Sequence, residues 1–264
     1  SCLASEWLIA RFVMGRRVAL FGWAPLVTGL LLGMNLPSGI PLWAVVIGSL
    51  FAIGVGKMAF GGLGCNIFNP ALVGRVFLLL SFPVLMTSWP VVGDGCLSWA
   101  DAVTAPTPLM LVKQGVVPDN QMVIGELVGN VGGSLGEVGA IAILLGLVYL
   151  MMFRIVTWHI PVSIILSVGV VSWLSGGNPL FDIVSGGLML GAVFMATDYV
   201  TSPMTRRGQL LYGVMIGVIT VVIRRWGVYP EGVSFAILIM NGATPLINRY
   251  VRPRPRRCAE GRCV

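Results

Sequence analysis

Long apolar stretches separated by short polar turns run through most of the chain. A membrane helix needs about 20 apolar residues, and most of these stretches approach that length. We therefore expect eight membrane spans, at residues 18–36, 41–60, 71–89, 138–153, 160–175, 182–197, 209–223 and 232–248. Residues 1–14 look like the end of an earlier helix, and the chain begins with Ser1 rather than Met. The full-length protein is therefore expected to have nine or ten helices.

The composition excludes a water-soluble protein. Of the 264 residues, 56% are hydrophobic and 10% are charged, whereas a soluble domain has about 25% charged residues. We therefore expect an all-α integral membrane protein, with residues 1–264 forming one polytopic domain in the lipid bilayer. The net charge is +7, but six arginines lie within residues 249–264. This concentration favours a basic cytoplasmic tail and argues against nucleic acid as a partner.

The positive-inside rule then orients the spans. If the basic tail lies inside, fourteen of the seventeen lysines and arginines fall on the inner side. The outer side receives only Lys113, Arg224 and Arg225. The same orientation makes residues 90–137 a long and mainly acidic external loop, and long connections of this kind are often functional.

The stretch DAVTAPTPL, residues 101–109, stands out in this external loop. A residue before proline is driven out of the α region, and Thr107 stands between two prolines. We expect Thr107 to present an exposed hydroxyl on an extended backbone, with Asp101 and Thr104 nearby in sequence. Such a hydroxyl is open to a modifying enzyme, although an ordinary loop threonine is the simpler interpretation of these residues alone.

Four separated stretches resemble the D subunits of the Rnf ion-translocating electron-transport complexes, and they follow in the family's order. They are GGLGCNIFNPALVGRVFLLLSFPVLMTSW (61–89), DAVTAPTPL (101–109), FRIVTWHIPVS (153–163) and the stretch from ATDYVTSPMTRRG to NRYVRPR (196–254). The resemblance covers nearly the whole chain. The chain is also similar to the B subunit of the Na⁺-translocating NADH:quinone reductase, and its RYVRPR ending is closer to the Rnf family.

The resemblance implies a flavoprotein. The family carries FMN joined by a phosphoester to the threonine of an Asp-x-x-Ser/Thr-x-x-Thr motif, which falls here on Asp101, Thr104 and Thr107. Thr107 would then hold the FMN phosphoryl group, and a separate flavin transferase would attach it from FAD. The chain departs from the family at Pro106, where a small residue is usual, which puts the fit to the transferase in question. A second, noncovalent flavin such as riboflavin is compatible with the resemblance but has no assigned residues.

The resemblance further implies a membrane subunit of a ferredoxin- and NAD-linked oxidoreductase complex. Such a subunit passes electrons between partner subunits, coupled to Na⁺ or H⁺ movement. It would lie in the cytoplasmic (inner) membrane of a bacterium or archaeon, with residue 107 on the outer, periplasmic side. The chain has no G-x-G-x-x-G nicotinamide motif, so it would not be catalytically complete alone. One histidine and five cysteines without a C-x-x-C pair predict no metal site.

Two other classes of protein stay open from the residues themselves. A flavin-free channel or secondary transporter also suits many glycine-rich spans, and a structural membrane scaffold needs neither flavin nor solute. The loops at residues 61–70 and 196–208 each join glycine-rich segments through a polar turn with proline. This similarity between the two loops predicts a pseudo-repeat, although inner turns favour glycine, asparagine and proline in any case.

Several further residues could carry chemistry. Thr244 lies in a flavin-motif-like NGATP stretch, but Asn241 and Leu238 occupy the positions where the motif requires Ser or Thr and Asp. We expect Asn66 or Asn69 to cap the following helix, or alternatively to line a site. The charged residues near span ends are expected to reach the membrane interface, with ion movement as the alternative role; they are Lys57, Arg75, Asp182, Asp198 and Glu231.

Overall fold

The computed structural model describes residues 1–15, 23–89, 107–129, 132–134, 136, 139–229 and 231–251. Within these ranges every regular element is a helix: thirteen α-helices, one 3₁₀-helix and one π-helix. The expectation of an all-α fold is therefore confirmed for the described residues.

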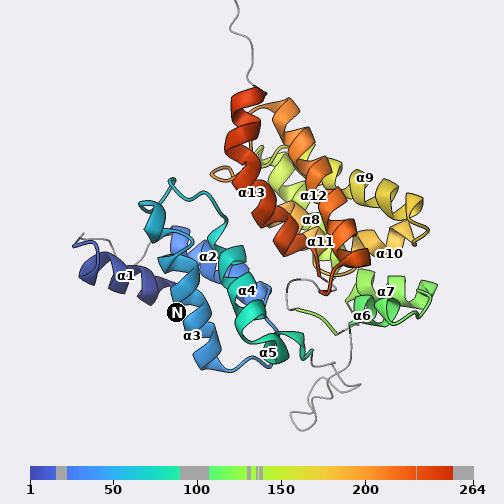
Figure 1. The fold of residues 1–264 in the computed structure, drawn as a ribbon, viewed down its shortest axis with the longest axis horizontal. Helices are drawn as coiled ribbons and strands as arrows, with labels where there is room; N and C mark the ends of the chain where they lie inside the picture. Colours follow the sequence, from blue (N-terminus) through green and yellow to red (C-terminus); the bar gives the residue numbers. More distant parts are fainter. Residues whose placement is uncertain are drawn as a thin grey trace, which may run out of the picture.

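The first five α-helices surround one apolar cluster, which includes Leu32, Ala52, Ile53 and Leu78. These elements are α1 (Cys2–Phe12), α2 (Trp23–Met34), α3 (Leu42–Gly54), the 3₁₀-helix η1 (Met58–Phe60), α4 (Pro70–Ser81) and α5 (Pro83–Thr87). Figure 1 shows them together on one side of the molecule.

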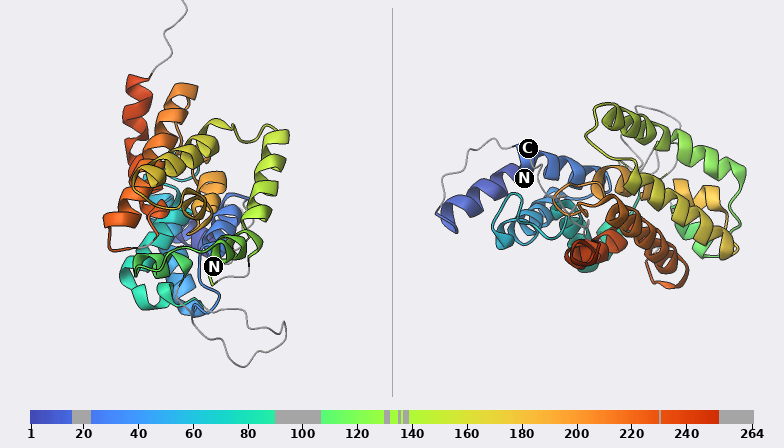
Figure 2. Two further views of the ribbon diagram at one scale, coloured as in Figure 1. Left: turned by 90° about the vertical axis from the view of Figure 1, so that its right-hand side faces the viewer. Right: turned by 90° about the horizontal axis from the view of Figure 1, so that it is seen from above.

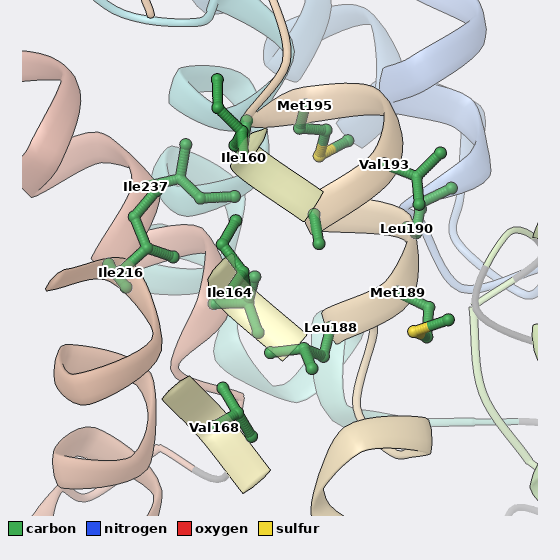
Figure 3. Close-up of a cluster of buried hydrophobic side chains, with 14 of the residues drawn as sticks. Ile160, Ile164, Val168, Leu188, Met189, Leu190, Val193, Met195, Ile216 and Ile237 are labelled. Atoms are coloured by element: carbon green, nitrogen blue, oxygen red, sulfur yellow. The ribbon is translucent and has the colours of Figure 1, made fainter. Parts of the chain in front are cut away.

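The remaining helices mainly surround a second, larger cluster, which Figure 3 shows in part. They are α6 (Pro108–Lys113), α7 (Asn120–Val128), α8 (Ala140–Met152), α9 (His159–Leu174), α10 (Pro179–Val184), α11 (Leu188–Leu190), the π-helix η2 (Gly191–Met195), α12 (Arg206–Trp226) and α13 (Val233–Tyr250). Helices α4 and α13 join the two halves, because Leu72 of α4 belongs to the second cluster and Phe235 of α13 packs against the first.

Helices α9 and α12 pack closely along a seam of small residues. A Cβ at Gly213 would lie 1.8 Å from the Ser163 Oγ, and a Cβ at Gly217 would lie 1.8 Å from the Ser167 Oγ. Both pairs repeat at a spacing of four residues, so they lie on one face of each helix. Small residues at this spacing let two helix backbones approach closely, as in membrane helix pairs.

Each of the eight expected spans contains at least one helix. Within the described residues, Leu42–Phe60 and Arg206–Trp226 are long and apolar enough to cross a membrane. Four shorter apolar helices, α2, α4, α8 and α9, accompany them. The number of eight spans therefore stays a prediction. Two of the expected spans are interrupted, residues 71–89 at Phe82 and residues 182–197 at Ser185–Gly187.

Helices α6 and α7 lie at the opposite end of the helical body from the last turn of α13. Figures 1 and 2 show α6 and α7 at one end, while α13 finishes at the other. A hydrogen bond agrees with this view, because Lys113 of α6 contacts Val228, in the turn before α13 begins. The 18 residues of α13 then run to Tyr250, a distance of about 27 Å at 1.5 Å per residue.

Candidate functional site

Thr107 is the N-cap residue of α6. Its backbone is extended (φ −61°, ψ 150°), and its hydroxyl accepts a hydrogen bond from the Met110 N–H at 3.3 Å. Pro108 occupies the first helical position, where its missing N–H costs nothing. The predicted extended conformation is confirmed. The predicted exposure is wrong, because only 9% of Thr107 is accessible; α6 lies against the helical body and does not project from it.

Leu109 anchors the beginning of α6. A Cβ at Gly186 would lie 2.8 Å from the Leu109 Cδ2 and 3.1 Å from the Arg224 Nη2. Gly186 also has a positive φ of 66°, which favours glycine. The absence of a side chain at this position therefore lets Leu109 approach the turn between α10 and α11.

Lys113 anchors the other end of α6. Its ammonium group donates hydrogen bonds to the carbonyl oxygens of Gly227 and Val228, the second at 2.9 Å. Gly227 ends α12, so the positive charge also lies at the favourable end of that helix. Partial desolvation of the ammonium group lowers the pKa of Lys113.

Two arginines near the end of α12, Arg224 and Arg225, contact α10 and the turn that follows it. The buried Arg224 donates from Nη1 to the Asp182 carbonyl oxygen at 2.5 Å and from Nη2 to that of Ser185 at 2.8 Å. The Asp182 carboxylate accepts a hydrogen bond from the Ser172 hydroxyl and lies 3.6 Å from the Arg225 Nη2. Asp182 is therefore part of a buried polar cluster and does not reach out to the interface. The motif residues Asp101 and Thr104 lie outside the described residues.

A second polar cluster lies where the two halves of the molecule meet. The Asn69 side chain accepts a hydrogen bond from the Ala71 N–H at 3.1 Å and donates one to the Met195 carbonyl oxygen at 3.2 Å. The expected cap is thus confirmed. The buried Asn241 amide, oriented to satisfy both neighbours, accepts from the Asn69 N–H at 3.2 Å and donates to the Tyr212 hydroxyl at 2.5 Å. Asn69 therefore joins the start of α4 to the end of η2.

Arg75 extends this cluster towards the start of α13. Its guanidinium group donates to the Asn35 Oδ1 at 2.7 Å and to the Ser234 Oγ at 3.2 Å, and it pairs with Glu231. Only 4% of Arg75 is accessible. The expectation that this charge reaches the interface is wrong, because α4 lies among other helices along this face.

The expectation that Lys57 reaches the membrane interface is also wrong. It is buried, and its ammonium group pairs with the Glu6 carboxylate at 2.6 Å. The pair ties the turn after α3 to α1. Sequence patterns place charges near helix ends, but they do not reveal a partner 51 residues away.

The contacts of α4 and α13 fix the depth at which α4 begins. Asn69 meets Asn241, halfway along α13, while Arg75 meets Ser234 and Glu231 near its start. Helix α4 therefore begins, and η2 ends, in the middle of the helical body. Interrupted helices that meet at mid-depth are typical of membrane transporters. The sequence patterns did not reveal this junction, although the Asn69–Pro70 pair is a recognisable helix start.

The remaining candidate residues, Asp198, Thr244 and His159, make contacts of the kind that stabilise a fold. The Asp198 carboxylate accepts hydrogen bonds from the Val200 N–H at 3.3 Å and the Thr201 hydroxyl at 3.4 Å, and burial raises its pKa. The Thr244 hydroxyl donates to the Thr201 carbonyl oxygen, in keeping with a packed helix residue. His159 begins α9 and stacks on Trp158. Across the described ranges, no group of three or more His, Cys, Asp or Glu side chains could hold a metal ion.

The described residues form an apolar, all-helical body with two helices long and apolar enough to cross a membrane, which fits a membrane protein. More particularly, the chain belongs to the NQR2, RnfD, RnfE family, whose model matches residues 1–257.

Three relatives are similar over most of their length. The D subunit of the Na⁺-translocating ferredoxin:NAD⁺ oxidoreductase complex of Acetobacterium woodii is 43% identical over 96% of this chain and 79% of its own. The D subunit of the proton-translocating ferredoxin:NAD⁺ oxidoreductase complex of Clostridium ljungdahlii is 40% identical over 96% and 80%. The D subunit of the ion-translocating oxidoreductase complex of Stutzerimonas stutzeri is 39% identical over 92% and 78%.

Proposed function

We propose that the chain is the D subunit of a membrane complex that couples electron transfer between ferredoxin and NAD⁺ to ion movement. Membership of the family over residues 1–257 and the names of the similar subunits support this role. One relative is named for Na⁺ and another for protons, so the transported ion stays open. The other subunits of the complex are the expected partners.

We further propose that Thr107 carries covalent FMN. The observation that carries this proposal is the position of Thr107 in a flavin-motif stretch, at the end of the body opposite to the last turn of α13. With the tail cytoplasmic, Thr107 lies on the outer side of the membrane, where a tethered cofactor is not lost to the surroundings. FMN supplies one- and two-electron chemistry, while the protein supplies its position and electrostatic surroundings.

The described residues fit a group bound at Thr107. The backbone at Thr107 is extended, and α6 begins only after this hydroxyl-bearing residue. Two cations belong to the same region, because Lys113 ends α6 and Arg224 lies beside Gly186, which Leu109 of α6 contacts. Positive charge of this kind stabilises the single negative charge of a phosphodiester. These residues would hold and orient the flavin, which would then exchange electrons with partner subunits.

Covalent flavin at Thr107 can be tested in the purified complex. The wild-type chain should give in-gel ultraviolet fluorescence, and its peptide with Thr107 should gain the mass of FMN less water. Thr107→Ala should lose both signals, while Thr107→Ser should keep a hydroxyl for attachment. Thr244→Ala is the matched control, because it alters the motif-like stretch in α13 and should leave fluorescence unchanged. Fluorescence that survives in Thr107→Ala would remove Thr107 from this role.

A flavin-free transporter is the second candidate function. The meeting of α4 and η2 at mid-depth favours it, since such junctions commonly form solute or ion sites. An absorption spectrum of the purified chain separates the two functions. Flavin bands support the redox subunit, whereas solute flux into vesicles without any flavin supports the transporter.

A further inference from the structure

The Thr107 hydroxyl is shielded from attachment in the docked form of α6. Only 9% of Thr107 is accessible, and its oxygen accepts the Met110 N–H. A hydroxyl becomes a nucleophile when a base on the enzyme can reach its proton and the electrophile can reach its oxygen. The neighbouring Pro108 and Leu109 are also buried, so little of this site is open to a transferase.

Few contacts keep α6 in this position. The helix has six residues, and a helix of that length is not stable without support from its surroundings. Leu109 contacts the Gly186 turn at one end, and Lys113 bonds to Gly227 and Val228 at the other. Loss of either contact should favour a form in which α6 has lifted from the body.

We propose that flavin attachment occurs on a form in which α6 has lifted from the body, and that Lys113 is the latch that keeps α6 docked until then. This inference rests on the proposed attachment of FMN to Thr107. In the attachment step the Thr107 oxygen forms a bond to the FMN phosphorus of FAD. The bond between that phosphorus and the bridging oxygen breaks, AMP leaves, and the hydroxyl proton passes to a base of the transferase.

While closed, the latch withholds Thr107 from the transferase, so a weaker latch should speed attachment. Replacement of a residue that only stabilised the fold would instead lower the yield of flavin attachment. A faster attachment therefore distinguishes a latch from a general structural role.

The test uses the full chain, made in cells without the transferase, then incubated in detergent with purified transferase and FAD. Lys113→Met should raise the initial rate of fluorescence incorporation about three- to tenfold, the factor that one hydrogen bond contributes to an opening equilibrium. Lys113→Arg keeps a donor and should stay near the wild-type rate. Gln114→Ala, at the exposed neighbouring position, is the matched control.

Two further measurements make the outcome decisive. Hydrogen exchange of residues 107–114 reports opening directly and should be faster in Lys113→Met. Leu109→Ala weakens the opposite end of α6 and should also speed attachment, which covers the case of a poorly folded Lys113→Met chain. Faster exchange with an unchanged attachment rate in both variants would overturn the latch alone. No attachment in any chain, including wild type, would overturn both the Thr107 proposal and the latch.

Discussion

The side-chain amide of Asn69 donates a hydrogen bond to the carbonyl oxygen of Met195, 3.2 Å away and 126 residues later in the chain. The bond joins the first turn of α4 to the last residue of the π-helix η2. A helix start carries partial positive charge and a helix end partial negative charge, so the two ends attract each other. A buried polar contact of this kind is sensitive to the loss of either partner.

Replacement of Asn69 tests this junction. Asn69→Ala removes the cap of α4 and the donor to Met195, and it should lower the free energy of unfolding by about 1–3 kcal/mol. Thermal unfolding in detergent measures the effect. Asn66→Ala is the control, since that side chain bonds locally to the Phe68 carbonyl oxygen and should cost less. Equal losses in the two variants would contradict a special role for the junction.

The seam between α9 and α12 predicts a second stability effect. Gly213→Ala brings a methyl group against Ser163, and overpacking of this kind typically costs about 1–3 kcal/mol. Gly33→Ala is the matched control, because no atom lies within 4 Å of a Cβ at that helical position. The control should be neutral or stabilising, since alanine is the better helix former. Unfolding temperatures of the two variants should therefore move in opposite directions or differ clearly.

The ion pair between Arg75 and Glu231 predicts a pattern across three variants. Arg75→Met leaves a mostly buried carboxylate without this partner and should cost about 3–5 kcal/mol. Glu231→Gln in the same chain should recover part of that loss, because the remaining group is neutral. A double-mutant cycle measures the coupling. Strict additivity of the two substitutions would show that the pair does not act as a unit.

Asp198 predicts a pH dependence of stability. It lies in the turn between η2 and α12, and burial raises its pKa above the ordinary value of 3.8. The folded state therefore binds this proton more tightly than the unfolded state, so stability falls as the pH rises through the raised pKa. Asp198→Asn should flatten the fall in unfolding temperature as the pH rises above about 4. Thr201→Val removes a donor to the carboxylate and should steepen it.

The local chemistry of the chain was predictable from the sequence. Proline after Thr107 predicted its extended backbone, which is confirmed. Asn66 or Asn69 was expected to cap the following helix, and Asn69 does so. Each apolar stretch also predicted a helical segment. These features depend on neighbours a few residues away, which a linear pattern contains.

The tertiary placement of the same residues was not predictable. Thr107 is buried because Leu109 and Lys113 contact turns that lie 77 and 114 positions later, so no local signal reports it. Arg75 is internal because its partners lie on α2 and α13. A helix that begins inside the body looks, in sequence, like one that begins at the membrane surface.

The long separation between the partners at the central junction has a consequence for synthesis. Helix α4 leaves the ribosome long before Met195, and before Glu231, which is 156 positions beyond Arg75. Until then the side chains of Asn69 and Arg75 lack these final partners. The buried polar contacts of α4 can therefore form only late in synthesis, after Met195 and Glu231 have been made, and the fold is complete only once α13 is in place.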